Sequence, residues 1–409
     1  MAALTPFRAL RPAPAAAARV AAVPYDVVNA QEAQALVNGN PLSFLHVSRA
    51  EIDLPANTDP YSDDVYRKAV ENFTALKGSA PLVVEETPSL YVYRLKMGDH
   101  VQTGIAGAFS IDEYDRDVIK KHERTRRDKE DDRTRHMIEL RAQTGPVFLT
   151  YKASPAVDAI VARVTAQRPL FDFAAPDRVQ HTIWRVDGND VQALVAAYAA
   201  IPALYIADGH HRAASAARAR QQLRGRSGAK GEWDTVLAVA FPDNQMQILP
   251  YNRVVKDLGS ETPQSLLGKL RETFTVKAGP ATPTRKGEVA MFLDGAWYTI
   301  ALGPVVTGAP ANAGASDRLD VSRLQDAVLT PLLGVGDVRT DKRIDFVGGA
   351  RGTAELEKLV ESGKAAVAFS LFPVSVNDLM QISDAGGIMP PKSTWFEPKL
   401  RDGLLSHLI

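Results

Sequence analysis

The residues best suited to chemistry are crowded into one short segment, Ala207-Asp208-Gly209-His210-His211-Arg212. They follow an apolar run at residues 203–207 that is typical of a buried strand, and they begin an alanine-rich stretch that favours a helix. Glycine permits a sharp bend at such a junction, and the first N–H groups of the helix, together with its dipole, attract anions. The pattern predicts a phosphate-binding turn between a strand and a helix.

Each residue from Asp208 to Arg212 has a candidate role. Gly209, His210 and Arg212 are candidates to bind nucleotide phosphates, with Arg212 able to form a two-pronged bond. Asp208 could hold Mg²⁺ or accept a proton, and His211 is a second catalytic candidate. Two alternatives stay open: Asp208 only caps the helix beside two solvated histidines, or the histidines hold a metal for hydrolysis. Adjacent histidines point in different directions and no third ligand is fixed nearby, which disfavours the metal.

A second chemical segment is the densely charged run at residues 120–133. Glu123, with His122, is an acid–base candidate there, and Arg126 and Lys129 are candidates to contact phosphate. The alternative is a solvated helix surface with ion pairs between successive turns, which is the usual meaning of dense mixed charge.

Near the start of the chain, Tyr25 and Asp26 follow Pro24 in a predicted turn and are candidates to contact a substrate. Equally, Asp26 could cap the helix that contains Glu32. We expect residues 40–47 to lead into a strand that brings His46 near the same cleft, although a lone histidine is more often structural.

Near the end of the chain, residues 389–399 are too polar and proline-rich for a strand and are expected to form an ordered loop. Lys392, Ser393 and Thr394 in this loop suit phosphate contacts, and a packed tail is the alternative. The sequence contains no P-loop, no dinucleotide-binding glycine motif, no nucleophile elbow and no HExxH. Standard kinase, dehydrogenase, hydrolase and zincin classes therefore lose support.

The elements that must position these residues alternate between strand-like and helix-like patterns, which predicts an α/β or mixed α+β architecture. We expect three regions: an N-terminal α/β region at 1–170, the phosphate-binding unit at 171–260, and a C-terminal α+β region at 261–409. Residues 303–317, rich in small residues and proline, are expected to form a long mobile loop. The predicted strands are 90–95, 105–110, 147–151, 181–186, 203–207, 235–241, 245–250 and 365–371, and the predicted helices are 128–143, 187–199, 211–223, 321–333 and 353–362.

Composition narrows the class of protein further. The 409 residues contain 48 basic and 48 acidic side chains, so no overall field attracts nucleic acid or an anionic membrane. Cysteine is absent, which excludes disulfides and thiolate chemistry and fits a reducing compartment. No apolar stretch approaches the roughly 20 residues that cross a bilayer. We expect a cytoplasmic protein with a small-molecule substrate and no nucleic-acid or membrane partner.

Taken in order, the Pro24-Tyr25-Asp26 turn, the charged segment from His122, the turn at residues 207–212 and the proline-rich tail resemble the prokaryotic domain-of-unknown-function family 1015. The turn itself is similar to that of ParB-like and sulfiredoxin-like folds, where it holds nucleotide phosphates. Free-serine kinases belong to that wider group. The resemblance implies ADP or ATP and Mg²⁺ as cofactors, and phosphotransferase chemistry on a small hydroxylated metabolite, plausibly serine or phosphoserine.

Two further hypotheses stand beside the kinase-like phosphotransferase. One is a regulatory protein that binds a nucleotide without turnover, and the other is nucleic-acid binding through the basic segment, which the neutral net charge disfavours. We allow for a homodimer.

Overall fold

The chain folds into two compact units. Both contain helices and strands, which confirms the expected mixed α/β class. Unit 1 comprises Met1–Met246 and Pro398–Ile409, and unit 2 comprises Gln247–Glu397. The structure is a computed structural model that describes residues 2–79, 82–303 and 314–409. Within those ranges, every helix is too short or too polar to cross a membrane.

Unit 1 is built on a mixed sheet of nine strands among the described residues. The central strands are buried along most of their length because their sequences are nearly continuous apolar runs, as in Val147–Tyr151. Most neighbours are antiparallel, but β11 pairs with β6 and β12 with β8 in parallel. In spatial order the strands are β6 Ile119–Lys120, β11 Leu204–Asp208, β8 Val147–Tyr151, β12 Thr235–Pro242, β5 His100–Ser110, β4 Tyr91–Met97, β10 Gln180–Arg185 and β9 Phe171–Ala174, with β1 Leu4–Thr5 beside β5.

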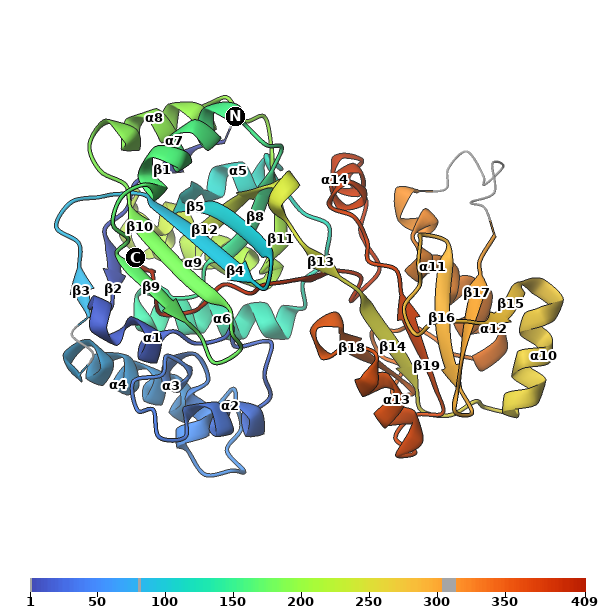
Figure 1. Ribbon diagram of the computed structural model, residues 1–409. Coiled ribbons are helices and arrows are strands. Elements are labelled where there is room, and N and C mark those ends of the chain that lie inside the picture. Colours follow the sequence, from blue (N-terminus) through green and yellow to red (C-terminus); the bar gives the residue numbers. More distant parts are fainter. Residues whose placement is uncertain (1, 80–81, 304–313) are drawn as a thin grey trace. The chain divides into compact units, whose positions relative to one another are not determined.

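The helices of unit 1 fall into groups that Figure 1 separates clearly. Helices α7 and α8 lie together against the sheet, and α2, α3 and α4 form a helical group of their own. Helix α9 packs on β8 and β12 and also contacts α6, which in turn contacts α4. The bounds are α1 Ala17–Val20, α2 Ala30–Val37, α3 Leu45–Ser48, α4 Asp63–Ser79, α5 Ile111–Asp115, α6 Arg127–Leu140, α7 Pro155–Thr165, α8 Asn189–Ala199 and α9 His210–Ser227.

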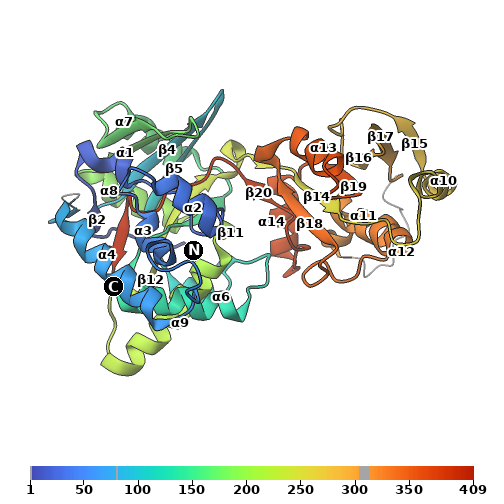
Figure 2. The same cartoon turned by 90° about the horizontal axis from the view of Figure 1, so that it is seen from below.

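The last twelve residues of the chain belong to unit 1 although unit 2 precedes them in sequence. Strand β21 (Ser406–Leu408) pairs with β2 (Ala9–Arg11) and β7 (Ala142–Gln143), and β3 (Val83–Val84) extends β2. In Figure 2, β21 is drawn in red among the blue and green elements of unit 1. Because β21 is anchored in this way, residues 398–405, which precede it, also lie in unit 1, together with their charged side chains.

Unit 2 is a second α/β body. An antiparallel sheet of six strands among the described residues is flanked by helices, and its small apolar core includes Val254, Phe292 and Leu356. The strands are β13 Ile248–Leu249, β14 Tyr251–Val255, β15 Thr275–Ala278, β16 Glu288–Leu293, β17 Ala296–Ala301, β18 Ile344–Gly348, β19 Val367–Leu371 and β20 Trp395–Phe396, where β13 and β20 form a separate pair. The helices are α10 Pro263–Thr273, α11 Asp320–Leu324, α12 Thr330–Leu333, α13 Ala354–Glu361 and α14 Val376–Asp384.

The units differ from the three expected regions. The expected boundary near residue 170 lies inside unit 1, because β10 pairs with both β9 and β4 and so joins segments on either side of it in one sheet. The expected boundary near residue 260 lies inside unit 2, since the chain leaves unit 1 at Met246.

Several local expectations are corrected by the structure. His46 lies in the short helix α3 and not after a strand. Asp26 does not cap α2, because Asn29 is the N-cap and forms a reciprocal capping box with Glu32. The strand predicted at 245–250 is reduced to Ile248–Leu249, preceded by a 3₁₀ turn.

The helix predicted at 321–333 is interrupted by a π-helical segment at Gln325–Leu329. Of the loop predicted at 303–317, residues 304–313 lie outside the described residues, and a 3₁₀ turn occupies Ala315–Arg318.

Candidate functional site

The turn between β11 and α9 has the backbone that the sequence predicted. Gly209 adopts φ +93°, and a Cβ added there would lie 2.9 Å from Nε of Arg212, so a side chain is excluded both by conformation and by space. Gly209 is itself the N-cap and no side chain caps the helix, which corrects the reading of Asp208 as a cap. The bond from Ala213 N–H to Gly209 O is the first of the helix ladder, so the preceding N–H groups have no partner within the helix.

Asp208 ends β11 as the partner of two cations. Its Oδ2 lies 3.3 Å from Nη2 of Arg212 and 3.4 Å from Nζ of Lys399. Burial alone would raise the pKa of this carboxyl, but Lys399 and Arg212 outweigh it and hold the pKa well below its usual range. The carboxylate is thus ionised and neutralised by side chains, with 28 % of the side chain exposed.

Arg212 lies beneath the turn and is buried. Its guanidinium donates to the carbonyl of Pro146 at 2.5 Å as well as to Asp208, so the two-pronged grip expected for phosphate is already used within the protein. Burial by itself would lower the pKa of Arg212, but the negative charges of Asp26, Asp208 and Asp402 have the larger effect and raise this pKa above its ordinary value. The guanidinium therefore stays cationic. Arg212 therefore acts as a fixed positive charge under the helix terminus.

Asp402 completes this cluster from the C-terminal segment. It is only 2 % exposed, and its Oδ1 has no hydrogen-bond partner among the described residues. The carboxyl fits against Gly145, where an added Cβ would lie 2.7 Å from Oδ1. Burial, helped by the charge of Asp26, raises the pKa of Asp402 to about 7, although Arg212 and Arg133 oppose the shift. This carboxyl can exchange a proton near neutral pH.

Two histidines are packed against each other beside the turn. The rings of His122 and His210 meet edge to face with centroids 4.4 Å apart, and the backbone N–H of His122 donates to Nε2 of His210 at 3.4 Å. Burial lowers the pKa of His122 to about 4 and lowers that of His210 well below its ordinary value. Both imidazoles are therefore neutral at pH 7. The alternative in which Asp208 merely caps the helix expected solvated histidines, but His210 is buried. Glu123 lies 3.9 Å from His210 Nδ1 and is partly exposed.

The remaining residues of the charged segment lie at different depths. Nε2 of His211 accepts from the backbone N–H of Arg126 at 3.0 Å, whereas the side chain of Arg126 is 70 % exposed and pairs with Asp128. Lys129 donates to the hydroxyl of Tyr61 at 2.8 Å on the surface. The side chains of Arg126 and Lys129 thus have surface partners, which fits the solvated-helix alternative for this part of the segment.

Arg133 also points inward, as do His122 and Asp132 of the same segment. Its guanidinium lies over the ring of Tyr25 at 4.3 Å and bonds to Asp132 at 2.8 Å and to the carbonyl of Ser48 at 3.2 Å. Burial raises the pKa of Tyr25 far above its ordinary value, so the phenol stays protonated. Asp26, the next residue, is exposed at the edge of the cluster and interacts electrostatically with Arg212 and Asp402.

The structure therefore brings together Tyr25, Asp26, Glu123 and the whole turn from Asp208 to Arg212. Sequence reasoning missed Lys399 and Asp402, because it gave chemical roles in the tail only to Lys392, Ser393 and Thr394. The signal that could have found them was the charged stretch from Lys399 to Asp402, which lies between apolar residues.

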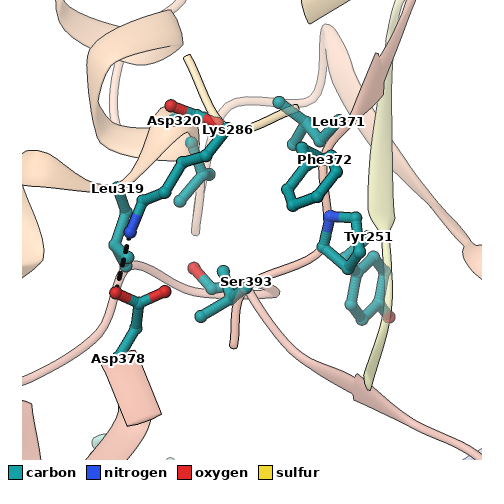
Figure 3. Close-up of a pocket in the computed structure, with 11 residues that line it drawn as sticks. Tyr251, Lys286, Leu319, Asp320, Leu371, Phe372, Asp378 and Ser393 are labelled. Carbon is teal, nitrogen blue, oxygen red and sulfur yellow. Dashed lines mark hydrogen bonds and ion pairs between the residues drawn. The ribbon is translucent and has the colours of Figure 1, made fainter. Parts of the chain in front are cut away.

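The predicted tail residues lie in unit 2, which has a small pocket of its own (Figure 3). Ser393 lines this pocket, but its hydroxyl donates to the carbonyl of Pro390 at 2.6 Å. Lys286 and Asp378 close one side of the pocket with an ion pair of 2.7 Å, and Phe372 lies across from them. Among the described residues that line the pocket, the lysine is already paired with Asp378, so its charge is not available to a phosphate.

The same residues are poorly arranged to bind a metal ion. Within the described ranges, no group of three or more histidine, aspartate or glutamate side chains is arranged to hold a metal ion. The nearest charges to the Asp208 carboxylate are Lys399 and Arg212, which oppose a divalent cation at Oδ2. Asp208 does not fit the predicted role of Mg²⁺ ligand on its own.

The family model described as "Protein of unknown function (DUF1015)" matches residues 4–322. The chain belongs to this family. The matched range contains the candidate site of this DUF1015 protein except for Lys399 and Asp402. No curated protein matches the chain.

Solved structures with similar backbones include a conserved hypothetical protein from Pyrococcus furiosus, at 15 % identity and TM-score 0.34 over 74 % of this chain and 95 % of that chain. A free serine kinase in complex with AMP matches at 14 % identity and TM-score 0.35, over 73 % of this chain and 92 % of that chain. SbnI with a C-terminal truncation, from Staphylococcus aureus, matches at 13 % identity and TM-score 0.38, over 74 % and 87 %. At these identities and TM-scores we draw no inference about activity from the likeness.

Proposed function

We propose that this DUF1015 protein is a nucleotide-dependent phosphotransferase that acts on a small hydroxylated metabolite, with serine or phosphoserine as the first candidates. The observation that carries the proposal is the cation pair of Arg212 and Lys399, held by Asp208 at the N-terminal end of an 18-residue helix. Phosphoryl transfer depends mainly on positioning and on charge stabilisation, which fixed cations and a helix terminus supply. The resemblance of the turn's sequence to that of ParB-like folds, which is itself an expectation from the sequence, supports this assignment.

Within this proposal, the phosphates of ADP or ATP bind at the N–H groups that begin α9, with Lys399 beside them and the charge of Arg212 below. Any Mg²⁺ is bound by the nucleotide phosphates and not by Asp208, because two side-chain cations already neutralise that carboxylate. Glu123 lies 3.9 Å from His210, and His211 is the next residue of the turn; we assign both Glu123 and His211 to contact the nucleotide.

Asp26 is the carboxylate that we assign to meet the substrate hydroxyl, since it is exposed, whereas Asp402 is buried and Asp208 is already paired with two cations. Asp402, with its pKa of about 7, is the group behind Asp26 that can take up a proton. The substrate hydroxyl then loses its proton towards this carboxylate pair as its oxygen attacks the terminal phosphorus. The bond from that phosphorus to the bridging oxygen breaks, and the nucleotide leaves with one phosphate fewer, its new terminal oxygen carrying the electron pair of the broken bond.

The test uses the purified full chain with calorimetric titration of AMP, ADP and ATP, followed by product analysis with serine. Lys399→Gln should weaken nucleotide binding about tenfold or more, because a charge-assisted contact is lost. Arg218→Gln is the matched control: it also removes a cation, from the same helix, where Arg218 pairs with Glu130 and Asp131. Equal dissociation constants for Lys399→Gln and the wild type would refute the assignment of the phosphate site.

Asp26→Asn tests the catalytic part separately. We expect kcat to fall about a hundredfold while the nucleotide dissociation constant is unchanged. An unchanged kcat would remove Asp26 from the reaction.

A nucleotide sensor without turnover is the second candidate, and it is favoured by the burial of His210 and the neutralisation of Asp208, which leave few exposed groups for proton transfer. Saturable nucleotide binding with no product after long incubation would establish the sensor.

A further inference from the structure

The carboxylate of Asp26 is held in place through its backbone. Its side chain is exposed, and among the described residues it has neither a hydrogen bond nor an ion pair. Tyr25, the residue before it, is buried, and the guanidinium of Arg133 lies over its ring at 4.3 Å. The direction of the Asp26 side chain is therefore set by the peptide that joins Tyr25 to Asp26.

This peptide is the centre of a β-turn. The N–H of Val27 donates to the carbonyl of Pro24 at 3.2 Å, so Tyr25 and Asp26 are the two central residues of the turn. Turns of types I and II differ by a flip of the central peptide, and type II requires a positive φ at the third residue. Asp26 has a negative φ. Aspartate is one of the few residues that tolerate a positive φ, so its own backbone preference does not prevent the flip.

Arg49 holds the central peptide in the observed orientation. Its Nη1 donates to the carbonyl oxygen of Tyr25, which is the oxygen of that peptide, at 3.2 Å. After a flip this oxygen would point to the opposite side of the turn, and the bond would be lost. Because the donor is charged, the bond is stronger than one between neutral groups. The bond therefore favours the form in which Asp26 keeps its negative φ.

The guanidinium of Arg49 is itself well supported. The residue lies between α3 and the 3₁₀ turn Ala50–Asp53. Its backbone N–H donates to the carbonyl of Leu45 at 2.8 Å, and its carbonyl accepts from the N–H of Ile52 at 3.1 Å. Nε of Arg49 lies 2.8 Å from Oε1 of Glu51, and these two side chains are 20 % and 16 % exposed. One edge of the guanidinium thus faces a carboxylate, while Nη1 reaches the turn.

We propose that Arg49 is a positioning residue that fixes the Tyr25–Asp26 peptide and thereby the direction of the Asp26 carboxylate. The inference rests on the proposed function, in which Asp26 meets the substrate hydroxyl. Arg49 touches neither the nucleotide nor the substrate and acts through the peptide before Asp26. A misplacement of about 1 Å in a reacting group can cost on the order of a hundredfold in rate, so the orientation of this peptide bears directly on turnover.

The first experiment is independent of any activity. Tyr25–Asp26 and Tyr114–Asp115 are the two Tyr–Asp pairs of the sequence. A deuterated full chain labelled with carbonyl-¹³C tyrosine and ¹⁵N aspartate therefore gives one carbonyl–amide NMR signal for each pair. The signal that disappears in Asp26→Asn is that of Asp26, and the signal of Asp115 is the internal reference.

Two arginine variants are compared in this experiment. Arg49→Gln removes the guanidinium from the turn. Arg11→Gln is the matched control, because Arg11 also pairs with a glutamate, Glu85, and also donates to a backbone carbonyl, that of Pro12. We expect the Asp26 signal to move or split in Arg49→Gln alone, because the carbonyl then loses its charged donor, and the reference signal to stay in place in both variants.

A second variant keeps the proposal testable should Arg49→Gln fail to fold. Glu51→Gln leaves the guanidinium of Arg49 without its anchoring carboxylate and should move the same Asp26 signal. An Asp26 signal at the wild-type position in folded Arg49→Gln, or in Glu51→Gln where the first variant does not fold, would overturn the proposal.

The second experiment measures the consequence for phosphoryl transfer. We expect kcat to fall about tenfold or more in Arg49→Gln while the nucleotide dissociation constant is unchanged, because only the carboxylate is misdirected. In an Asp26→Asn background the same substitution should change kcat by less than about twofold, because no carboxylate is left to direct.

Two kinetic outcomes would also overturn the proposal. One is a wild-type kcat in Arg49→Gln although Asp26→Asn is impaired, and the other is a tenfold loss in the Asp26→Asn background, which would mean that Arg49 acts elsewhere. If Asp26→Asn alone leaves kcat unchanged, or if the wild type shows no turnover, the proposed function fails instead. The NMR signals then still decide whether Arg49 holds the peptide before Asp26.

Discussion

Replacing Asp402 by asparagine is expected to stabilise unit 1 at neutral and alkaline pH. Asp402 is 2 % exposed, and folding raises its pKa from an ordinary value of 3.8 to about 7. Each pKa unit corresponds to roughly 1.4 kcal/mol, so holding the ionised carboxylate in the fold costs about 4 kcal/mol. Asparagine has the same shape and carries no charge that must be buried.

The sign of the effect sets the pH window. Because the pKa of Asp402 is higher in the folded than in the unfolded chain, its favourable contribution is complete below about pH 4 and is lost as pH rises towards 7. The free energy of unfolding of Asp402→Asn relative to the wild type should therefore grow between pH 4 and 7. Above pH 7 it should level off at about 4 kcal/mol.

The assay is urea unfolding at several pH values between 4 and 8, followed by tryptophan fluorescence. Replacing Trp297 and Trp395 by phenylalanine leaves the emission to the two tryptophans of unit 1, so that the transition reports that unit. Asp99→Asn, in an exposed turn, is the matched control and should change stability by less than about 0.5 kcal/mol. If the difference in free energy of unfolding between Asp402→Asn and the wild type were the same at every pH from 4 to 8, the reasoning would be refuted.

Two further predictions concern the support of the site. Gly209→Ala should destabilise unit 1 by about 1–3 kcal/mol in urea unfolding, because its φ of +93° is strained for alanine and the Cβ would meet the guanidinium of Arg212. Gly225→Ala, which adds a methyl group in open space on the same helix, is the control and should leave the free energy of unfolding unchanged or raise it. Equal changes in the free energy of unfolding for the two variants would contradict this account. Tyr66→Phe should cost about 1–3 kcal/mol by thermal unfolding, because it removes the 2.9 Å bond to the buried carboxylate of Asp132. The surface counterpart Tyr61→Phe should cost under about 0.5 kcal/mol, and a cost as large as that of Tyr66→Phe would count against the burial argument.

Much of the fold was predictable because its signals are local. The apolar run before Asp208 gave β11, and the alanine-rich stretch after it gave α9, each within a few residues of its observed bounds. The strand at residues 147–151 was predicted with its observed ends because the run is apolar except for Thr150 and is bounded by Pro146 and Lys152. Expectations failed where the local signal was weak, as for His46 in α3, a helix of four residues.

Sequence by itself determined the bend at Gly209, since only a glycine tolerates that backbone next to an arginine, and it determined that acidic and basic groups gather there. Tertiary structure alone decided which of those groups face one another. Lys399 meets Asp208 across 191 positions of sequence because β21 pairs with the first strands of the chain. The same return of the chain buries Asp402 beside Arg212, and burial, which no local pattern encodes, changes the pKa of that carboxyl from ordinary to near neutral.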